Sequence, residues 1–180
     1  GVKVVQVGGE VFTSELYNHL RQYSNAHIYN GYGPSEFTAC CCNKEIIDGS
    51  NVSIGTPFCN TKIYILDDNH CLCPIGIPGE ICVVGDGIAK GYLNRPDLTN
   101  KVFVPSPFDN GKMYKTGDIG KWLPNGEIEY IGRRDFQIKI RGLRVELSEI
   151  EKKLQTYPDI KNCSVVYIKD VQDPHIAAFF

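Results

Sequence analysis

Residues 132–147 hold the densest cationic run of the chain, GRRDFQIKIRGLRVEL, and this run limits how the chain can fold. Five basic residues stand here against two acidic ones, and apolar and polar residues alternate from Phe136 to Ile140. An alternation with a period of two is typical of a half-buried strand. Taken alone, the stretch is compatible with a basic strand that binds nucleic acid, a charged edge strand, or a joint between two bodies.

The charge of the whole chain argues against nucleic acid as a partner. The formal net charge is −2 and the sequence pI is about 6.1, whereas phosphate contacts normally need a basic face. No apolar run approaches the ~20 residues that span a bilayer, and the first residues, GVKVVQVGGE, lack the pattern of a signal peptide. We therefore expect neither a nucleic-acid partner nor a membrane.

The eight cysteines do not follow the pattern of a disulfide scaffold. Three of them, at positions 40–42, are consecutive, and one residue separates Cys71 from Cys73, which is poor geometry for pairing. Neither arrangement is the CxxC pair of a zinc ribbon. We interpret these residues as reduced thiols that serve as small core residues in a cytoplasmic protein.

Residues 1–48 are interpreted as the end of an α/β subdomain. The β-branched run Val2–Val7 predicts a buried strand, and Ala26–Tyr29 predicts a second one. Between them, Thr13 can cap a helix that continues to Tyr23. Because the sequence enters a strand at once, we expect the chain to be part of a longer protein.

The heptapeptide Asn30–Glu36, NGYGPSE, combines backbone freedom with polar side chains. Gly31 and Gly33 allow a ligand to approach the backbone closely. An amide, an aromatic ring, the Ser35 hydroxyl and the Glu36 carboxylate suit a phosphorylated ligand with a divalent cation. The alternative is a glycine-rich turn whose polar residues are incidental.

Residues 49–134 alternate short strand patterns with turn signals. From Val52 to Trp122 we expect an all-β region, most simply a small distorted barrel. Asp118 follows a glycine at the end of a strand, in YKTGD. Its carboxylate could accept two hydrogen bonds from the cis-diol of a sugar, or it could cap a turn.

Residues 135–180 predict the start of a small α+β lobe. Ser148 and Glu151 form a capping-box pattern at the beginning of a helix. Asn162–Ile168 predicts a strand, and His175 begins a returning strand as an edge residue rather than a ligand. The chain is therefore predicted to be mixed α+β: the tail of an α/β lobe, a small distorted β-barrel and a truncated α+β lobe.

Four ordered motifs carry a resemblance that spans almost the whole chain. They are NGYGPSE at 30–36, GEICVVGDGIAKGYLNRPDLT at 79–99, YKTGD at 114–118 and GRRDFQIKIRGLRVELSEIE at 132–151. With these motifs in this order, the chain resembles the adenylation domains of non-ribosomal peptide synthetases, within the adenylate-forming superfamily of AMP-binding enzymes.

The resemblance implies activation of an amino acid in two steps. The amino-acid carboxylate attacks the α-phosphate of ATP, pyrophosphate leaves, and the aminoacyl-adenylate then passes to the phosphopantetheine thiol of a peptidyl carrier protein domain. The implied cofactors are ATP and Mg²⁺. No nucleophile on the enzyme is needed, because catalysis rests on positioning and on neutralising charge at the phosphate oxygens.

The same resemblance assigns the parts of a nucleotide site. Asn30 would bond the adenine amino group, Gly31 would lie along the ring, and Tyr32 would stack on it. Ser35 would contact the α-phosphate, and Glu36 would bind Mg²⁺.

For the sugar, the resemblance implies that Asp118 holds the ribose hydroxyls, with Arg133 close to the same sugar and Tyr130 nearby. The implied amino-acid pocket is lined by small, uncharged residues: Val5, Val7, Gly8, Gly31, Ala39 and Cys40. Nothing there would pair with a charged side chain. We therefore expect a neutral amino acid, apolar or aromatic, as the substrate.

Two parts of the family's machinery are expected outside this sequence. The glycine-rich phosphate loop should precede residue 1, and the catalytic lysine should lie beyond Phe180. Lys139 aligns with a different family lysine and is no substitute. We therefore expect no catalytic residue and no adenylation activity in these 180 residues alone.

Two other interpretations stay open. One is an acyl-CoA synthetase or a D-alanyl carrier-protein ligase of the same superfamily, although IGTPFCNTKIYILDD and YLNRPDLT look more like the modular synthetases. The other is a non-catalytic nucleotide-binding or interaction module. The intact Glu36, Asp118 and Arg133 count against that second alternative.

Within the resemblance, the cationic stretch becomes a joint rather than a ligand site. A large lobe would end at Arg134, Asp135 would be the hinge, and a small lobe would start at Phe136. In this family the small lobe rotates about that point between the two half-reactions, which requires a polar interface that can exchange its pairs.

Overall fold

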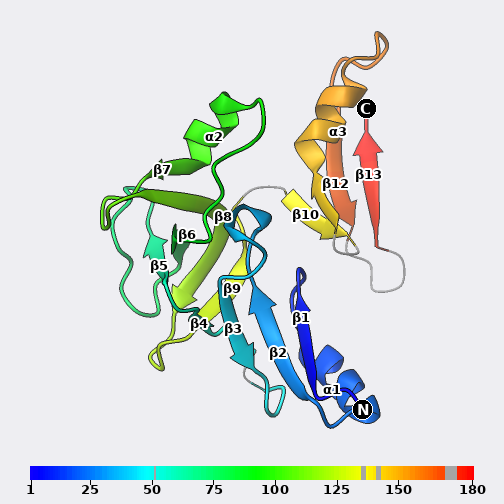
Figure 1. Ribbon diagram of the computed structural model, residues 1–180. Helices are drawn as coiled ribbons and strands as arrows, with labels where there is room; N and C mark the ends of the chain where they lie inside the picture. The colour runs from blue at the N-terminus through cyan, green and yellow to red at the C-terminus, as the bar shows by residue number, and fades with distance from the viewer. Residues whose placement is uncertain (51, 135–136, 141–142, 169–173) are drawn as a thin grey trace. The chain divides into compact units, whose positions relative to one another are not determined.

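A computed structural model describes residues 1–50, 52–134, 137–140, 143–168 and 174–180. Its elements are, in chain order, β1 (Val4–Gly8), α1 (Ser14–Tyr23), β2 (His27–Tyr32), the 3₁₀ helix η1 (Ser35–Phe37), β3 (Cys42–Glu45), β4 (Thr56–Pro57), β5 (Thr61–Leu66), β6 (Gly79–Gly85), α2 (Pro96–Val102), β7 (Phe103–Pro105), β8 (Lys112–Trp122), β9 (Ile128–Arg133), β10 (Gln137–Ile140), β11 (Leu143–Glu146), α3 (Leu147–Leu154), β12 (Ser164–Ile168) and β13 (His175–Phe179) (Figure 1). Contacts group the chain into two compact units, Gly1–Arg134 and Asp135–Phe180. The mixture of helices and sheets confirms the predicted α+β class.

The first unit begins with a sheet of strand order β1-β2-β3-β4, in which β1 runs parallel to β2 and β3 runs antiparallel to it. Helix α1 joins the two parallel strands, as the sequence predicts (Figure 1). An apolar cluster lies between this helix and the sheet: Phe12, Tyr17, Ile28 and Ile46. The prediction that the first strand is buried is wrong for this structure. Strand β1 is at the edge of the described sheet, and its residues are exposed or half-buried.

Helix α1 starts where its capping residue predicts. The backbone N–H of Leu16 donates to the Thr13 hydroxyl at 3.2 Å, which satisfies one of the free donors of the first turn. Glu15 in the first turn and Arg21 in the last turn complement the helix dipole. The Arg21 guanidinium also lies over the ring of Tyr17, 5.1 Å from its centroid.

The second sheet of this unit is built around β8, whose eleven residues make it the longest described strand. Strand β6 pairs along one side of β8, while β7 and β9 share its other side at opposite ends. Strand β6 is buried on both faces, which explains the apolar run at its residues 81–84.

The described strands of this sheet do not close into a barrel. Closure would require the edge strand β5 to pair with β7 or β9, and among the described residues β5 pairs only with β6. Instead, two hydrogen bonds connect the two sheets: Ile54 N–H to the Ile128 carbonyl, and Ile128 N–H to the Gly55 carbonyl, both 2.9 Å. The expected barrel is therefore an open sheet joined to its neighbour.

Helix α2 interrupts the region that the sequence predicts to be all β. Its signals were present: Pro96 stands in the first turn with Asp97, and Lys101 lies in the last turn. Its seven residues are too few to show an amphipathic pattern, and none of them is buried. The strand patterns on both sides of α2 therefore led to the prediction of an all-β region.

The second unit contains the hairpin β10–β11, helix α3 and the antiparallel pair β12–β13. The capping-box prediction is wrong. Helix α3 begins at Leu147, with Glu146 as its N-cap residue and no side-chain capping bond. The carboxylate of Glu151 instead accepts the backbone N–H of Val165 at 2.8 Å, so β12 takes the group that the box would have used. His175 opens β13 opposite Ile168, as predicted.

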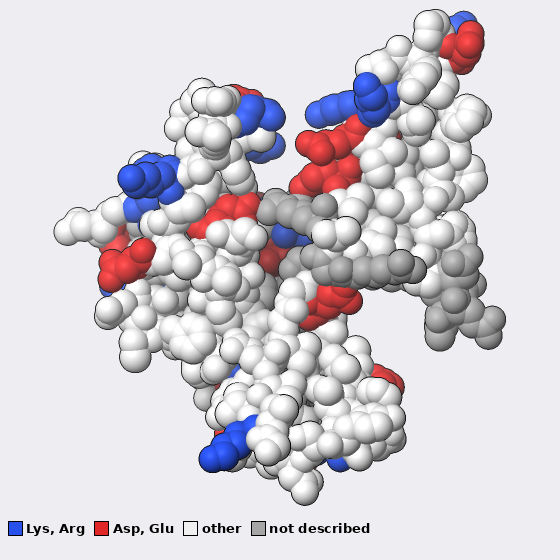
Figure 2. Space-filling view, turned by 45° about the vertical axis from the view of Figure 1, so that its right-hand side comes forward, with Lys and Arg blue, Asp and Glu red and all other residues white. Residues whose placement is uncertain are grey.

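The surface carries both signs of charge. On the face shown in Figure 2, acidic and basic side chains are interspersed over the described residues. None of the helices in the described ranges is long and apolar enough to cross a bilayer.

Candidate nucleotide-binding site

The centre of the candidate site is an ion pair across two neighbouring strands, between a buried carboxylate and a half-buried guanidinium. Asp118 on β8 and Arg133 on β9 are direct partners in the sheet register. Arg133 Nη1 lies 2.9 Å from Asp118 Oδ1, and the same nitrogen donates to the Thr116 carbonyl at 3.1 Å. Asp118 is 7% exposed. The two residues that the sequence assigns to a ribose are therefore in contact.

A distortion of β8 presents this carboxylate. The register of β6 against β8 shifts between Glu80 and Cys82, so Thr116 and Gly117 lie in an irregularity of the ladder. The Thr116 hydroxyl donates to the Ile81 carbonyl at 2.7 Å, and the Gly117 N–H donates to Glu80 Oε1 at 3.1 Å. Both bonds replace ladder bonds that the bulge removes. Gly117 has a φ of +74°, which favours glycine at this position.

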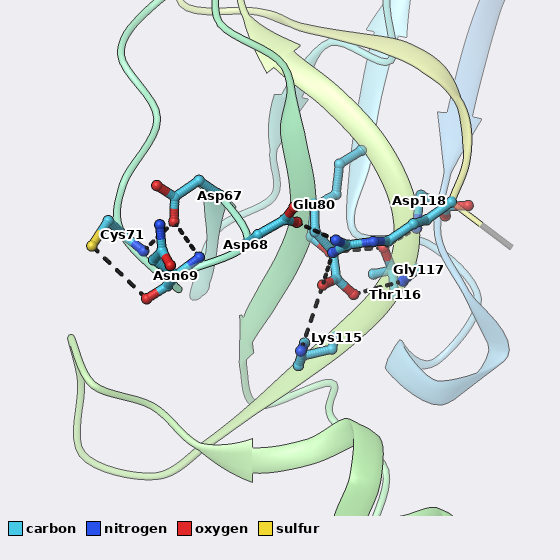
Figure 3. Close-up of polar contacts among 11 residues, drawn as sticks. Asp67, Asp68, Asn69, Cys71, Glu80, Lys115, Thr116, Gly117 and Asp118 are labelled. Carbon is cyan, nitrogen blue, oxygen red and sulfur yellow. Dashed lines mark hydrogen bonds and ion pairs between the residues drawn. The ribbon is translucent and has the colours of Figure 1, made fainter.

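Glu80 connects the bulge to the residues around it (Figure 3). Besides the Gly117 N–H, its carboxylate lies 3.7 Å from Lys115 Nζ and 3.8 Å from Arg134 Nη1. Arg134 also pairs with Asp68, and its backbone N–H donates to the Gly117 carbonyl at 2.8 Å. The carboxylate of Glu80 thus links the end of the first unit to the irregular part of β8 that precedes Asp118.

Tyr32 reaches the same carboxylate from the first sheet. Its hydroxyl donates to Asp118 Oδ2 at 2.5 Å, and its ring lies 6.1 Å from the ring of Tyr130, tilted by 43°. Burial raises the pKa of Tyr32 well above its ordinary value, and the neighbouring charge of Asp118 raises it further. The hydroxyl therefore stays protonated and remains a donor. The structure brings together four of the predicted residues here: Tyr32, Asp118, Tyr130 and Arg133.

Asn30 is buried two residues before Tyr32 on the same strand, with 5% of its surface exposed. Its side-chain nitrogen donates to the Ser53 carbonyl at 2.8 Å. Because residues two apart in a strand share a face, Asn30 and Tyr32 are on one face of β2, and Gly31 lies on the other.

The loop after β2 places Ser35 and Glu36 in η1. Ser35 is exposed, whereas Glu36 is buried and its Oε1 accepts a hydrogen bond from the Tyr92 hydroxyl. A Cβ on Gly33 would lie 2.4 Å from the Cα of Cys40, so only glycine allows the loop to fold back so closely.

Glu36 can supply one carboxylate to a magnesium ion. Within the described ranges, no three side chains of His, Cys, Asp or Glu come together as a complete metal site. Magnesium is usually bound by one or two carboxylates together with substrate phosphates and water. The carboxylate of Glu36, next to Ser35 in η1, therefore fits an ion that arrives with a nucleotide.

The predicted amino-acid pocket falls on two faces of the first sheet. A Cβ on Gly31 would lie 2.5 Å from Gln6 Nε2 and 3.3 Å from Cys40 Sγ, so these two side chains pack closely beside Gly31. Gly8 is the register partner of Gly31. Val7, in contrast, packs against the apolar cluster under α1. Val5 is two residues from Val7 and shares its face.

Gln6 is a neighbour of the predicted pocket residues that the sequence analysis did not single out. It is the polar member of a β-branched run, flanked by valines that face the other way, and strand alternation alone could have identified it. Its Nε2 lies 3.7 Å from Cys40 Sγ. Burial raises the pKa of the Cys40 thiol, so the thiol stays protonated and uncharged. Ala39 precedes it with a φ of +74°.

The proposed hinge residue, Asp135, lies outside the described residues. All eight cysteines lie within them and are free thiols. Those at 41, 42 and 82 are buried, whereas Cys59 and Cys71 are exposed. The predicted role as core residues therefore applies to only some of them.

Known proteins identify the class of this fold. One similar solved structure is PA1221, an NRPS protein containing adenylation and PCP domains. The match covers 99% of this chain and 38% of the PA1221 chain, with a TM-score of 0.86 and 27% sequence identity. The Vibrio cholerae adenylation domain AlmE, solved with glycyl-adenosine-5′-phosphate, matches 98% of this chain and 35% of its own, with a TM-score of 0.86 and 28% identity. The fold is that of an adenylation domain.

The chain belongs to the AMP-binding enzyme family, which its residues 1–93 match. Bacitracin synthase 3 of Bacillus licheniformis is 46% identical over 172 residues, which cover 94% of this chain. The chain spans only 3% of the length of that protein. The predicted resemblance to the adenylation domains of peptide synthetases is thereby confirmed.

Proposed function

We propose that this chain forms part of an adenylation domain that activates an amino acid with ATP for non-ribosomal peptide synthesis. The observation that carries the proposal is the ion pair of the buried Asp118 with Arg133, with the Tyr32 hydroxyl on the second carboxylate oxygen. An ionised carboxylate only accepts hydrogen bonds, which is the chemistry that the two hydroxyls of a ribose need from a binding partner. The capping alternative for Asp118 explains neither of these partners.

The residues around this pair would hold the nucleotide and contribute little covalent chemistry. The Asn30 amide oxygen would accept a hydrogen bond from the adenine amino group. Tyr32 and Tyr130 would contact the nucleoside, and Ser35 would contact the α-phosphate. Glu36 would hold Mg²⁺, which neutralises phosphate charge when it is bound. The protein's contribution to adenylation would then be position and charge compensation.

The substrate proposed here is a neutral amino acid. The side chains beside Gly31, those of Gln6 and Cys40, carry no charge, and a glycyl-adenylate occupies the similar AlmE domain. The proposed acceptor is the phosphopantetheine of a carrier domain, as suggested by the adenylation and PCP domains of PA1221. The reduced thiols favour the cytoplasm as location.

Nucleotide binding with and without a ribose diol tests the proposal. We expect calorimetry to show that the chain binds AMP more tightly than 2′,3′-dideoxy-AMP, and that Asp118→Ala abolishes this preference. Loss of charge-assisted hydrogen bonds should weaken AMP binding by about tenfold or more. Asp109→Ala is the matched control, because Asp109 pairs with Lys62 and Tyr64 on the outside of the same unit.

Equal binding of the two nucleotides by the unchanged chain would contradict the ribose assignment. So would a preference for the diol that survives in Asp118→Ala. Amino-acid-dependent pyrophosphate exchange by the complete domain would then decide between an adenylating enzyme and a binding module.

A further inference from the structure

The orientation of the Asn30 amide is determined by its neighbour. Its nitrogen, Nδ2, lies 2.8 Å from the Ser53 carbonyl oxygen. The opposite orientation would bring two carbonyl oxygens to that distance, where they repel each other and leave a buried acceptor unsatisfied. The amide nitrogen is therefore directed to Ser53, and the amide oxygen is directed away from it.

Ser53 is itself held on both sides of its hydroxyl. The residue is 2% exposed. Its hydroxyl donates to Glu127 Oε2 at 2.8 Å and accepts the Gly55 N–H at 3.1 Å. Residues 54–55 exchange two hydrogen bonds with Ile128, the residue after Glu127. These bonds hold the Ser53 segment beside the Glu127 segment.

Glu127 completes a closed set of contacts with Lys44. Lys44 Nζ lies 2.6 Å from Glu127 Oε2, and both side chains are largely buried. Lys44 on β3 is the register partner of Asn30 on β2. Burial alone would raise the pKa of the Glu127 carboxyl, but hydrogen bonds from Lys44, Ser53 and Asn125 lower it below its ordinary value. The carboxylate stays charged and keeps its donors.

We propose that Ser53, Glu127 and Lys44 are positioning residues that lock the Asn30 amide with its oxygen toward the base, and thereby select 6-aminopurine over 6-oxopurine nucleotides. The inference rests on the proposed nucleotide site and adds a specificity to it. A 6-amino group donates a hydrogen bond to the locked oxygen. A 6-oxo group presents a second acceptor there, and the amide cannot turn its nitrogen toward that group without abandoning Ser53.

The test compares AMP with IMP, which differ at position 6 of the base. Binding of both is measured by calorimetry to the 180-residue chain and to its Glu127→Ala and Lys44→Met variants. In each variant we expect the preference for AMP to fall by about threefold to tenfold, as the loss of one net hydrogen bond would give. The change should come partly from tighter IMP binding, because a freed amide can turn and donate to the oxo group.

Glu129→Ala is the matched control. Glu129 is two residues from Glu127 on the same hairpin and pairs with Lys121 at 3.3 Å, away from Ser53. Its AMP-to-IMP ratio should equal that of the unchanged chain. Glu127→Gln, which keeps an acceptor for Ser53, should retain more of the preference than Glu127→Ala.

A purely structural role would weaken AMP and IMP binding by the same factor, and that outcome would overturn the inference. An unchanged chain that binds AMP no better than IMP would overturn it as well. The proposed function is tested by a separate measurement. If that function is wrong, the complete domain shows no amino-acid-dependent pyrophosphate exchange. A preference for AMP that is lost in Lys44→Met supports the inference in either case.

Discussion

Single residues decide the chemistry of the space beside Gly31. The Gln6 amide and the Cys40 thiol meet there, and the Cys40 sulfur also contacts the Cys42 carbonyl at 3.1 Å. A Cβ at position 31 would come within 2.5 Å of the Gln6 amide nitrogen, so a larger residue there would displace that side chain. The surroundings are polar but uncharged, which is the basis for a neutral substrate.

A carboxylate in this space should therefore disturb the substrate. In the complete domain, we expect Cys40→Asp to lower kcat/KM for the native amino acid in pyrophosphate exchange by about tenfold or more, since a half-buried charge without a cation beside a neutral substrate is unfavourable. Cys59→Asp is the control, because Cys59 is exposed. An amino-acid profile that is the same in Cys40→Asp and in the unchanged domain would refute the pocket assignment.

At the scale of elements, two helix starts with similar sequence signals behave differently. Thr13 caps α1 with its side chain, whereas Ser148 lies inside α3 and caps nothing. The difference arises because Glu151 is engaged by β12 and Glu146 precedes the helix. Helix ends are therefore set by tertiary partners as well as by the local sequence.

The two hydroxyls should differ in their contribution to stability. We expect Thr13→Ala to lower the free energy of unfolding by about 1 kcal/mol, the usual value of an N-cap bond. Ser148→Ala should change it by less than about 0.5 kcal/mol, as is usual for an exposed substitution. Urea unfolding monitored by circular dichroism measures both, and an equal loss in the two variants would show that the capping assignment is mistaken.

At the scale of the whole molecule, the chain is two compact units that meet in sequence at Arg134 and Asp135. Arg134 is tied to the first unit through Glu80, Asp68 and the Gly117 carbonyl. The cationic run of the sequence thus contributes structural pairs before the boundary, and the proposal that Asp135 is a hinge remains a prediction from the sequence.

A rigid residue at the boundary would test the hinge. In the complete enzyme, we expect Asp135→Pro to impair transfer to the carrier thiol more than adenylation, because proline fixes φ and restricts the rotation between the two half-reactions. Single-turnover assays of thioester formation and of pyrophosphate exchange measure the two steps separately. An equal loss in both steps would count against the hinge.

The sequence by itself determined the class of protein, because ordered motifs survive as strings of letters. It also predicted the α1 cap, a strand on either side of that helix, and a place for Asp118 near Arg133, since these depend on local pattern or on the family's motifs. Strand periodicity further contained the signal for Gln6, although the neighbouring valines obscured it.

Only the tertiary structure decided which groups meet across long separations in the sequence. Ser53 and Glu127 approach Asn30 because two sheets are joined at Ile128, and no local pattern encodes that junction. The open sheet in place of a barrel, and the use of Glu151 by β12, have the same origin. Hydrogen-bond partners and burial depend on where separate segments pack, and this is settled by the free energy of the whole fold rather than by any single stretch.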